Sequence, residues 1–148
     1  MADTKYGHLF VKAPITMRVQ GKGLTLNAAQ YFPELQYWLR WNLITTPWVM
    51  EEPHSHDFDQ AWHVFGANSM DISEFEAELE VHLGAEDEKY VITTPQVIYI
   101  PKGLIHCPVV FKRVDKPIVW LNIAFAGDYL KTMGDGEVRG LEDGWRNA

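Results

Sequence analysis

The chain has 148 residues, enough for one domain, and a domain of this length removes about 70% of its unfolded surface from water. Its 13 basic and 20 acidic residues give a net charge of −7, which argues against nucleic acid or an anionic membrane as a partner. Cys107 is the only cysteine, so an internal disulfide is excluded. No apolar run approaches the roughly 18 residues of a membrane helix, and the first residues lack a secretion signal. These features predict a single domain, residues 1–148, in the cytoplasm.

The first half of the chain predicts one strand after a long lead-in. Residues 1–34 are punctuated by glycine and proline and are expected to be irregular or poor in strands. Residues 35–44 alternate with period two and predict a strand. Its two faces would carry Leu35, Tyr37, Leu39, Trp41 and Leu43 on one side and Gln36, Trp38, Arg40 and Asn42 on the other.

The second half predicts a series of short strands. They are expected at residues 59–65, 75–83, 90–94, 97–100, 106–114 and 117–125. The segment 75–83 has the cleanest alternation and would form a hairpin with 90–94, and the last two strands would pair around Asp115 and Lys116. The tail 127–148 would hold a turn of helix or pack Trp145 against a neighbouring surface. Short strands at close spacing predict an all-β barrel or sandwich with its core at about 35–125.

Three histidines indicate a metal site. Residues His54 and His56 stand two apart, so on a strand they share one face with Gln60. Burying these polar groups without partners would be costly, and a bound metal satisfies them together. His106 follows a tight turn at Pro101 and Gly103 and can close the set. The alternative is that each histidine is an ordinary surface residue. Imidazoles with a pKa near 6.5 also predict that metal binding weakens below about pH 6.

These residues resemble the two motifs of the cupin superfamily. His54, His56, Gln60 and a slightly displaced Gly66 match the first motif, and Pro101, Gly103 and His106 match the second. The resemblance covers about residues 35–125. It implies a single double-stranded β-helix (jelly-roll) barrel with one divalent transition metal at one mouth, assembled as a homodimer. Iron(II) or zinc(II) is expected first, and nickel(II) or manganese(II) next.

Gln60 departs from the family pattern because a glutamate normally stands at this position. A neutral amide leaves the metal more positive, and Gln60 would either complete the coordination sphere or hydrogen-bond a metal-bound water or substrate. Asp57 and Asp59 lie nearby, but their odd parity points them away. Some cupin lyases use a tyrosine beside the metal, so Tyr99 is a candidate acid or base. The alternative is that its ring anchors the Pro-x-Gly turn.

Other residues have a functional and a structural interpretation. Arg40 could bind an anionic substrate, although a solvated face with a salt bridge is the simpler interpretation. Phe58, Trp62 and Trp120 could shape a small-molecule pocket, or they could belong to an ordinary core. Cys107 is expected on the face opposite His106, as a small buried apolar residue rather than a thiol beside the metal.

The sequence therefore predicts a metal-dependent enzyme acting on a small organic molecule. With iron it would be an oxidoreductase of the dioxygenase type. With zinc, nickel or manganese it would be a Lewis-acid lyase, isomerase or hydrolase. The alternative is a non-catalytic module that binds or senses a small ligand. A purely structural metal is disfavoured, because structural zinc sites are usually closed by four protein ligands.

Overall fold

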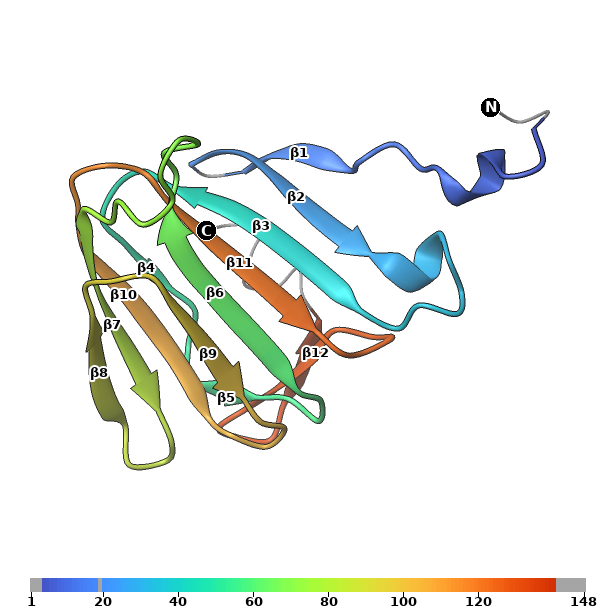
Figure 1. Ribbon diagram of the computed structural model, residues 1–148. Coiled ribbons are helices and arrows are strands. Elements are labelled where there is room, and N and C mark those ends of the chain that lie inside the picture. Colours follow the sequence, from blue (N-terminus) through green and yellow to red (C-terminus); the bar gives the residue numbers. More distant parts are fainter. Residues whose placement is uncertain (1–3, 19, 141–148) are drawn as a thin grey trace.

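Two antiparallel β-sheets face each other in the computed structural model, which describes residues 4–18 and 20–140 (Figure 1). The described strands are β1 (Ile15–Arg18), β2 (Gly21–Asn27), β3 (Trp38–Ile44), β4 (Trp48–Met50), β5 (His54–Ser55), β6 (Gln60–Gly66), β7 (Ala77–Leu83), β8 (Glu88–Ile92), β9 (Gln96–Ile100), β10 (His106–Val114), β11 (Ile118–Ala124), β12 (Leu130–Met133) and β13 (Val138–Gly140). Two short 3-10 turns, η1 (Gly7–Leu9) and η2 (Ala28–Gln30), complete the described elements.

The strand order gives a jelly-roll arrangement. One sheet runs β1-β2-β3-β11-β6-β9, and the other runs β13-β12-β5-β10-β7-β8 with β4 paired to β10. Consecutive strands β5 and β6, β9 and β10, and β10 and β11 lie in different sheets. The predicted antiparallel pairing of 106–114 with 117–125 is therefore wrong. The intervening turn crosses between the sheets, and β10 pairs with β7 while β11 pairs with β3 and β6.

The ends of the chain hold more strand than the sequence indicated. Within the predicted lead-in, β1 and β2 extend the first sheet, and β2 pairs with β3. Gly23 is needed there, because a Cβ at this position would lie 2.7 Å from the carbonyl oxygen of Trp41. In the tail, β12 pairs with β5 where a turn of helix was one prediction. Trp145 lies outside the described residues. Before β1, the chain extends away from the sheets (Figure 1).

Several predicted features are confirmed. Strand β7 buries Ala77, Leu79 and Val81 and forms the predicted hairpin with β8. The even-numbered residues from His54 to Val64 are all buried, as period-two alternation requires, whereas Asp57 is exposed and Asp59 half-buried. The strand predicted at 35–44 begins only at Trp38.

The interior of the barrel is apolar at its centre and polar toward one end. The main core cluster includes Trp62, Phe111 and Trp120, and a smaller cluster holds Phe58, Ala124 and Tyr129. On β3 the buried face carries Arg40 and Asn42 rather than the leucines and Trp41. The solvated-face interpretation of Arg40 is therefore wrong. Among the described residues no helix is long and apolar enough to cross a membrane.

Candidate metal centre

The three predicted histidines meet at the polar end of the barrel. His54 on β5 lies opposite His106 on β10, and His56 lies in the connection that leads from β5 to β6 and so from one sheet to the other. The Pro101–Gly103 turn fixes this connection, because the Gly103 amide donates to the His56 carbonyl at 2.7 Å. Gly103 has a φ of 84°, which explains the glycine of the second motif.

Each imidazole is oriented by a backbone carbonyl. The Nδ1 atoms of His54, His56 and His106 lie 2.6, 2.6 and 2.8 Å from the carbonyl oxygens of Glu52, Leu130 and Leu104. A carbonyl only accepts, so each Nδ1 carries the proton and each Nε2 keeps its lone pair. This is the tautomer of metal-binding histidines held by outer hydrogen bonds.

The three rings also lie next to one another, although only His54 and His106 belong, with Cys107, to a group whose ligand atoms all lie within 4.8 Å of one another. The ring centroids are 4.4 Å apart for His54 and His106, 4.9 Å for His54 and His56, and 5.0 Å for His56 and His106. The Nε2 atom of His56 is buried and has no hydrogen-bond partner among the described residues. A buried acceptor without a partner is costly, and a cation would satisfy it. The residues present therefore fit a bound metal ion.

Burial keeps these imidazoles neutral. It is the main cause that lowers the pKa of His54 to about 4 and the pKa values of His56 and His106 to about 3. The positive charges of Lys131 and Arg40 lower the pKa of His54 further, and the carbonyl of Glu52 partly opposes them. At neutral pH the site therefore offers neutral nitrogen ligands without having to release protons.

Gln60 lies inside the site with its amide in a defined orientation. Its Nε2 lies 3.1 Å from the His106 Nε2, and its Oε1 accepts from Asn122 Nδ2 at 3.0 Å and from the Tyr129 hydroxyl at 3.3 Å. Because the His106 Nε2 carries no proton, the glutamine amide is the donor in the first bond. Gln60 thus turns its nitrogen, which is not a metal ligand, toward the histidines.

We expect the Gln60→Glu variant to bind metal at least about tenfold more tightly, a gain of about 1.4 kcal/mol in binding free energy. The reason is that a carboxylate adds a negative charge and an oxygen that can bind the metal. The metal-free variant should also be less stable, because glutamate cannot donate to His106. Calorimetric titration with zinc and denaturant unfolding of the metal-free protein measure the two effects. An unchanged affinity would show that residue 60 does not reach the metal.

Cys107 lies beside the site, whereas strand alternation predicted it on the face opposite His106. A β-bulge between His106 and Val109 places both His106 and Cys107 on the inner side, with Val109 and Phe111 after them. Ligand atoms of His54, His106 and Cys107 lie within 4.8 Å of one another, so this buried group could also hold a metal. Cys107 packs in the apolar core as expected, and burial raises the pKa of its thiol well above the ordinary value.

Tyr99 is not brought to the histidines. Its side chain is 63% exposed, and its hydroxyl donates to Asp59 at 2.9 Å on the outer surface. Asp59 also accepts from the Lys102 amide at 3.0 Å, and these two bonds lower its pKa. The Tyr99 hydroxyl is therefore linked to the Pro-x-Gly turn only through Asp59.

The predicted pocket residues separate into three groups. Phe58 stacks on His56 with centroids 4.5 Å apart, and Trp62 meets the edge of His106 at 5.3 Å. Trp120 packs against Trp62 within the main core. Arg40 is buried beside the site, where its Nη2 donates to the Tyr129 hydroxyl at 2.6 Å and its guanidinium lies 4.4 Å from the centre of that ring.

Sequence reasoning missed four residues at the site. Asn122 on β11 and Tyr129 before β12 hold Gln60, while Glu51 and Lys131 lie beside His54. Burial raises the pKa of Tyr129 to about 12, so its hydroxyl stays protonated as a donor. The alternation of β11 places Asn122 with the buried Trp120 and Ala124, a signal that was present in the sequence. Tyr129 and Lys131 lay in a segment not expected to form a strand.

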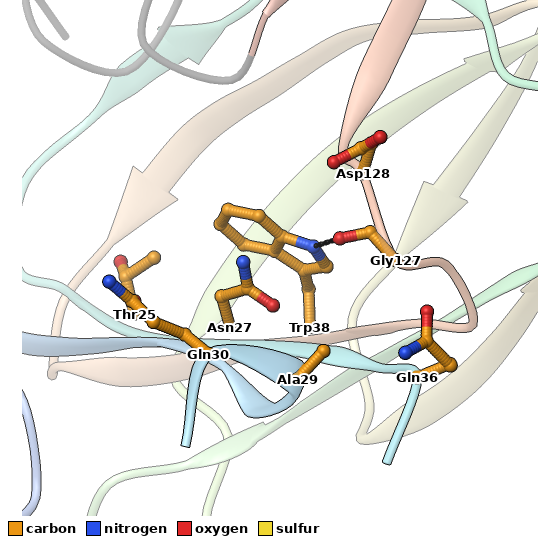
Figure 2. Close-up of a pocket in the computed structure, with 8 residues that line it drawn as sticks. All are labelled: Thr25, Asn27, Ala29, Gln30, Gln36, Trp38, Gly127 and Asp128. Atoms are coloured by element: carbon orange, nitrogen blue, oxygen red, sulfur yellow. Dashed lines mark hydrogen bonds between the residues drawn. The ribbon is translucent and has the colours of Figure 1, made fainter. Parts of the chain in front are cut away.

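A separate polar pocket of about 720 Å³ lies around Trp38 and Gly127 (Figure 2). It is lined by Thr25, Asn27, Ala29, Gln30, Gln36, Trp38, Gly127 and Asp128. Trp38 donates to the Gly127 carbonyl at 3.0 Å and packs against Tyr129 with centroids 5.9 Å apart. The Trp38 and Tyr129 rings thus lie between the pocket and His56, and the ring centroids of Tyr129 and His56 are 5.0 Å apart.

Comparison with solved structures shows a cupin fold. An oxalate oxidase in complex with the substrate analogue glycolate has a TM-score of 0.54 and 13% identity, covering 95% of this chain and 67% of the other. A variant of the oxalate decarboxylase from B. subtilis has a TM-score of 0.54 and 10% identity, covering 88% and 30%. A polyketide cyclase from Streptomyces resistomycificus has a TM-score of 0.51 and 13% identity, covering 90% and 77%.

The molecule is therefore an all-β protein with the cupin fold and a buried cluster of possible metal ligands. The chain spans only about 30% of the length of the decarboxylase and 29% of a capsular polysaccharide assembling protein from Staphylococcus aureus that also matches. No family model matches the sequence, and no curated protein is similar to it in sequence.

Proposed function

We propose that the protein is a metal-dependent enzyme that acts on a small organic anion. The observation that supports the metal is the set of three buried imidazoles whose Nδ1 atoms are tied to carbonyls, with an unpartnered Nε2 on His56. His54, His56 and His106 would hold one divalent transition metal. When bound, this ion would supply either a Lewis acid or a redox centre.

The buried guanidinium of Arg40 supports an anionic substrate. It lies on the inner face of β3, and the Tyr129 hydroxyl that it contacts also bonds to Gln60. Guanidinium groups are suited to bidentate binding of carboxylates. Tyr129 and Asn122 would orient the substrate through their hydroxyl and amide groups. Two structural neighbours are named for oxalate, a small dicarboxylate, which agrees with this class.

Elemental analysis of protein purified without a metal-affinity tag tests the proposal, and we expect one equivalent of a transition metal per chain. If the metal is iron, oxygen uptake should be tested against small carboxylic acids, catechols, β-diketones, thiols and flavonoids, because uptake would identify a dioxygenase or oxidase. Turnover without oxygen would identify a Lewis-acid enzyme. Absence of metal even after reconstitution would overturn the proposal, and ligand binding without turnover would leave a sensing module.

A further inference from the structure

Glu51 is a buried carboxylate aimed at His54. Its side chain is only 7% exposed, and its Oε2 lies 3.3 Å from the His54 Nε2. The residue directly follows β4 and has a φ of 59°, a left-handed conformation that costs a non-glycine residue about 1–2 kcal/mol. Its neighbour Glu52 has a side chain that is 74% exposed. The chain therefore turns one of two consecutive glutamates inward.

The contact between Glu51 and His54 requires a cation. The proton on His54 Nδ1 is donated to the Glu52 carbonyl, so Nε2 faces the carboxylate with a lone pair. Either a second proton or a metal ion must lie between these two acceptors. A proton would satisfy only His54, whereas a metal held by His54 has further ligands at hand, because the ligand atoms of His54, His106 and Cys107 lie within 4.8 Å of one another.

The distance also suits two ligands of one ion. Nitrogen and oxygen ligands lie about 2.1 Å from zinc, which places two tetrahedral ligands about 3.4 Å apart. The observed separation is 3.3 Å. The other carboxylate oxygen, Oε1, lies 3.6 Å from Nζ of the buried Lys131, which holds the group in this orientation.

We infer that Glu51 is the carboxylate ligand of the metal centre and provides the negative charge that Gln60 lacks. This inference rests on the proposed metal site and assigns one more ligand to it. The carboxylate comes from the end of β4, three residues before His54, and not from the position on β6 where the first motif carries its glutamate.

The test is the affinity of the full-length, metal-free protein for zinc alone, measured by calorimetric titration. We expect Glu51→Gln to weaken zinc binding by at least 10- to 100-fold, the range seen even for residues that only support a ligand. Glu52→Gln is the matched control and should bind within about twofold of the wild type. With cobalt(II) in place of zinc, the visible spectrum should change for the Glu51 variant and stay unchanged for the Glu52 variant.

Loss of Glu51 leaves Lys131 buried without its ion-pair partner, so the single variant could unfold. A second variant, Glu51→Gln combined with Lys131→Met, removes both charges and should fold while still binding zinc weakly. Wild-type affinity in the folded Glu51→Gln variant, or an affinity in the double variant equal to that of Lys131→Met alone, would overturn the role of Glu51 and leave the histidine site intact. Failure of the wild type itself to bind zinc, cobalt, iron or manganese would instead overturn the proposed function.

Discussion

Replacing His106 with alanine is expected to abolish binding of one equivalent of metal. His106 contributes one of three buried Nε2 atoms and lies 4.4 Å from His54 between ring centroids. Because residues that merely support a ligand already alter affinity by about 10- to 100-fold, loss of a direct ligand should exceed about 100-fold. Titration of the metal-free variant with zinc and elemental analysis of the purified protein measure this loss.

The same change should destabilise the metal-free protein. Gln60 would lose the acceptor for its Nε2, and a buried donor without a partner costs about 1–3 kcal/mol. His82→Ala is the matched control, because His82 lies on β7 away from the site and is paired with Asp87. It should leave both metal content and affinity unchanged. Stoichiometric, tight metal binding by the His106 variant would favour a different ligand set.

The candidate site could largely be predicted because period-two alternation is a local property. His54, His56, Phe58, Gln60 and Trp62 are all buried as their parity requires. The Pro-x-Gly turn likewise brings His106 to His54. Alternation failed at Cys107, where a β-bulge resets the parity, and bulges have no reliable sequence signal.

The remaining errors have a long-range cause. The buried face of β3 was ambiguous because Arg40 and Asn42 alternate with apolar residues, and apolar residues usually face the core. They point inward because that end of the barrel already holds Gln60, Asn122 and Tyr129, an environment that only the assembled sheets create. Tyr99 points outward because β9 pairs with β6 in a register that sets it beside Ala61, on the face opposite Gln60 and the buried Ile100.

The two proposals, Glu51 as a metal ligand and an anionic substrate, are consistent with the charges at the site. Arg40 and Lys131 bring two positive charges into the interior, and a divalent metal would add two more. The Glu51 carboxylate offsets only one of these four. A substrate with one or more carboxylates would reduce the remaining charge, which buried sites do not tolerate well.

Acid is expected to destabilise the metal-free protein well above the pH at which carboxylates titrate. The pKa values of about 4 for His54 and about 3 for His56 and His106 lie below the unfolded value near 6.5. Between these values the unfolded chain binds more protons than the folded one, so stability falls as pH falls. Each histidine contributes up to about 1.4 kcal/mol per pH unit in this window.

Three such histidines together predict a loss of up to about 4 kcal/mol per unit near pH 5, enough to unfold a domain of ordinary stability. The histidines of the folded site stay neutral down to about pH 4. Metal binding should therefore be retained near pH 5.5. Imidazoles with an unshifted pKa would instead lose metal below about pH 6. Denaturant unfolding of metal-free protein from pH 7 to 4.5 measures the slope.

His56→Gln supplies the matched control for this prediction, because glutamine can donate to the Leu130 carbonyl but does not take up a proton. Its slope should fall by up to about a third, one histidine's share of the three. Added zinc should raise stability at pH 7 through its binding to the folded state alone, and this gain should persist to pH 4.5, because the imidazoles of the folded state stay neutral down to about pH 4. A flat stability profile between pH 6.5 and 4.5 would show that the three imidazoles are not held neutral by burial.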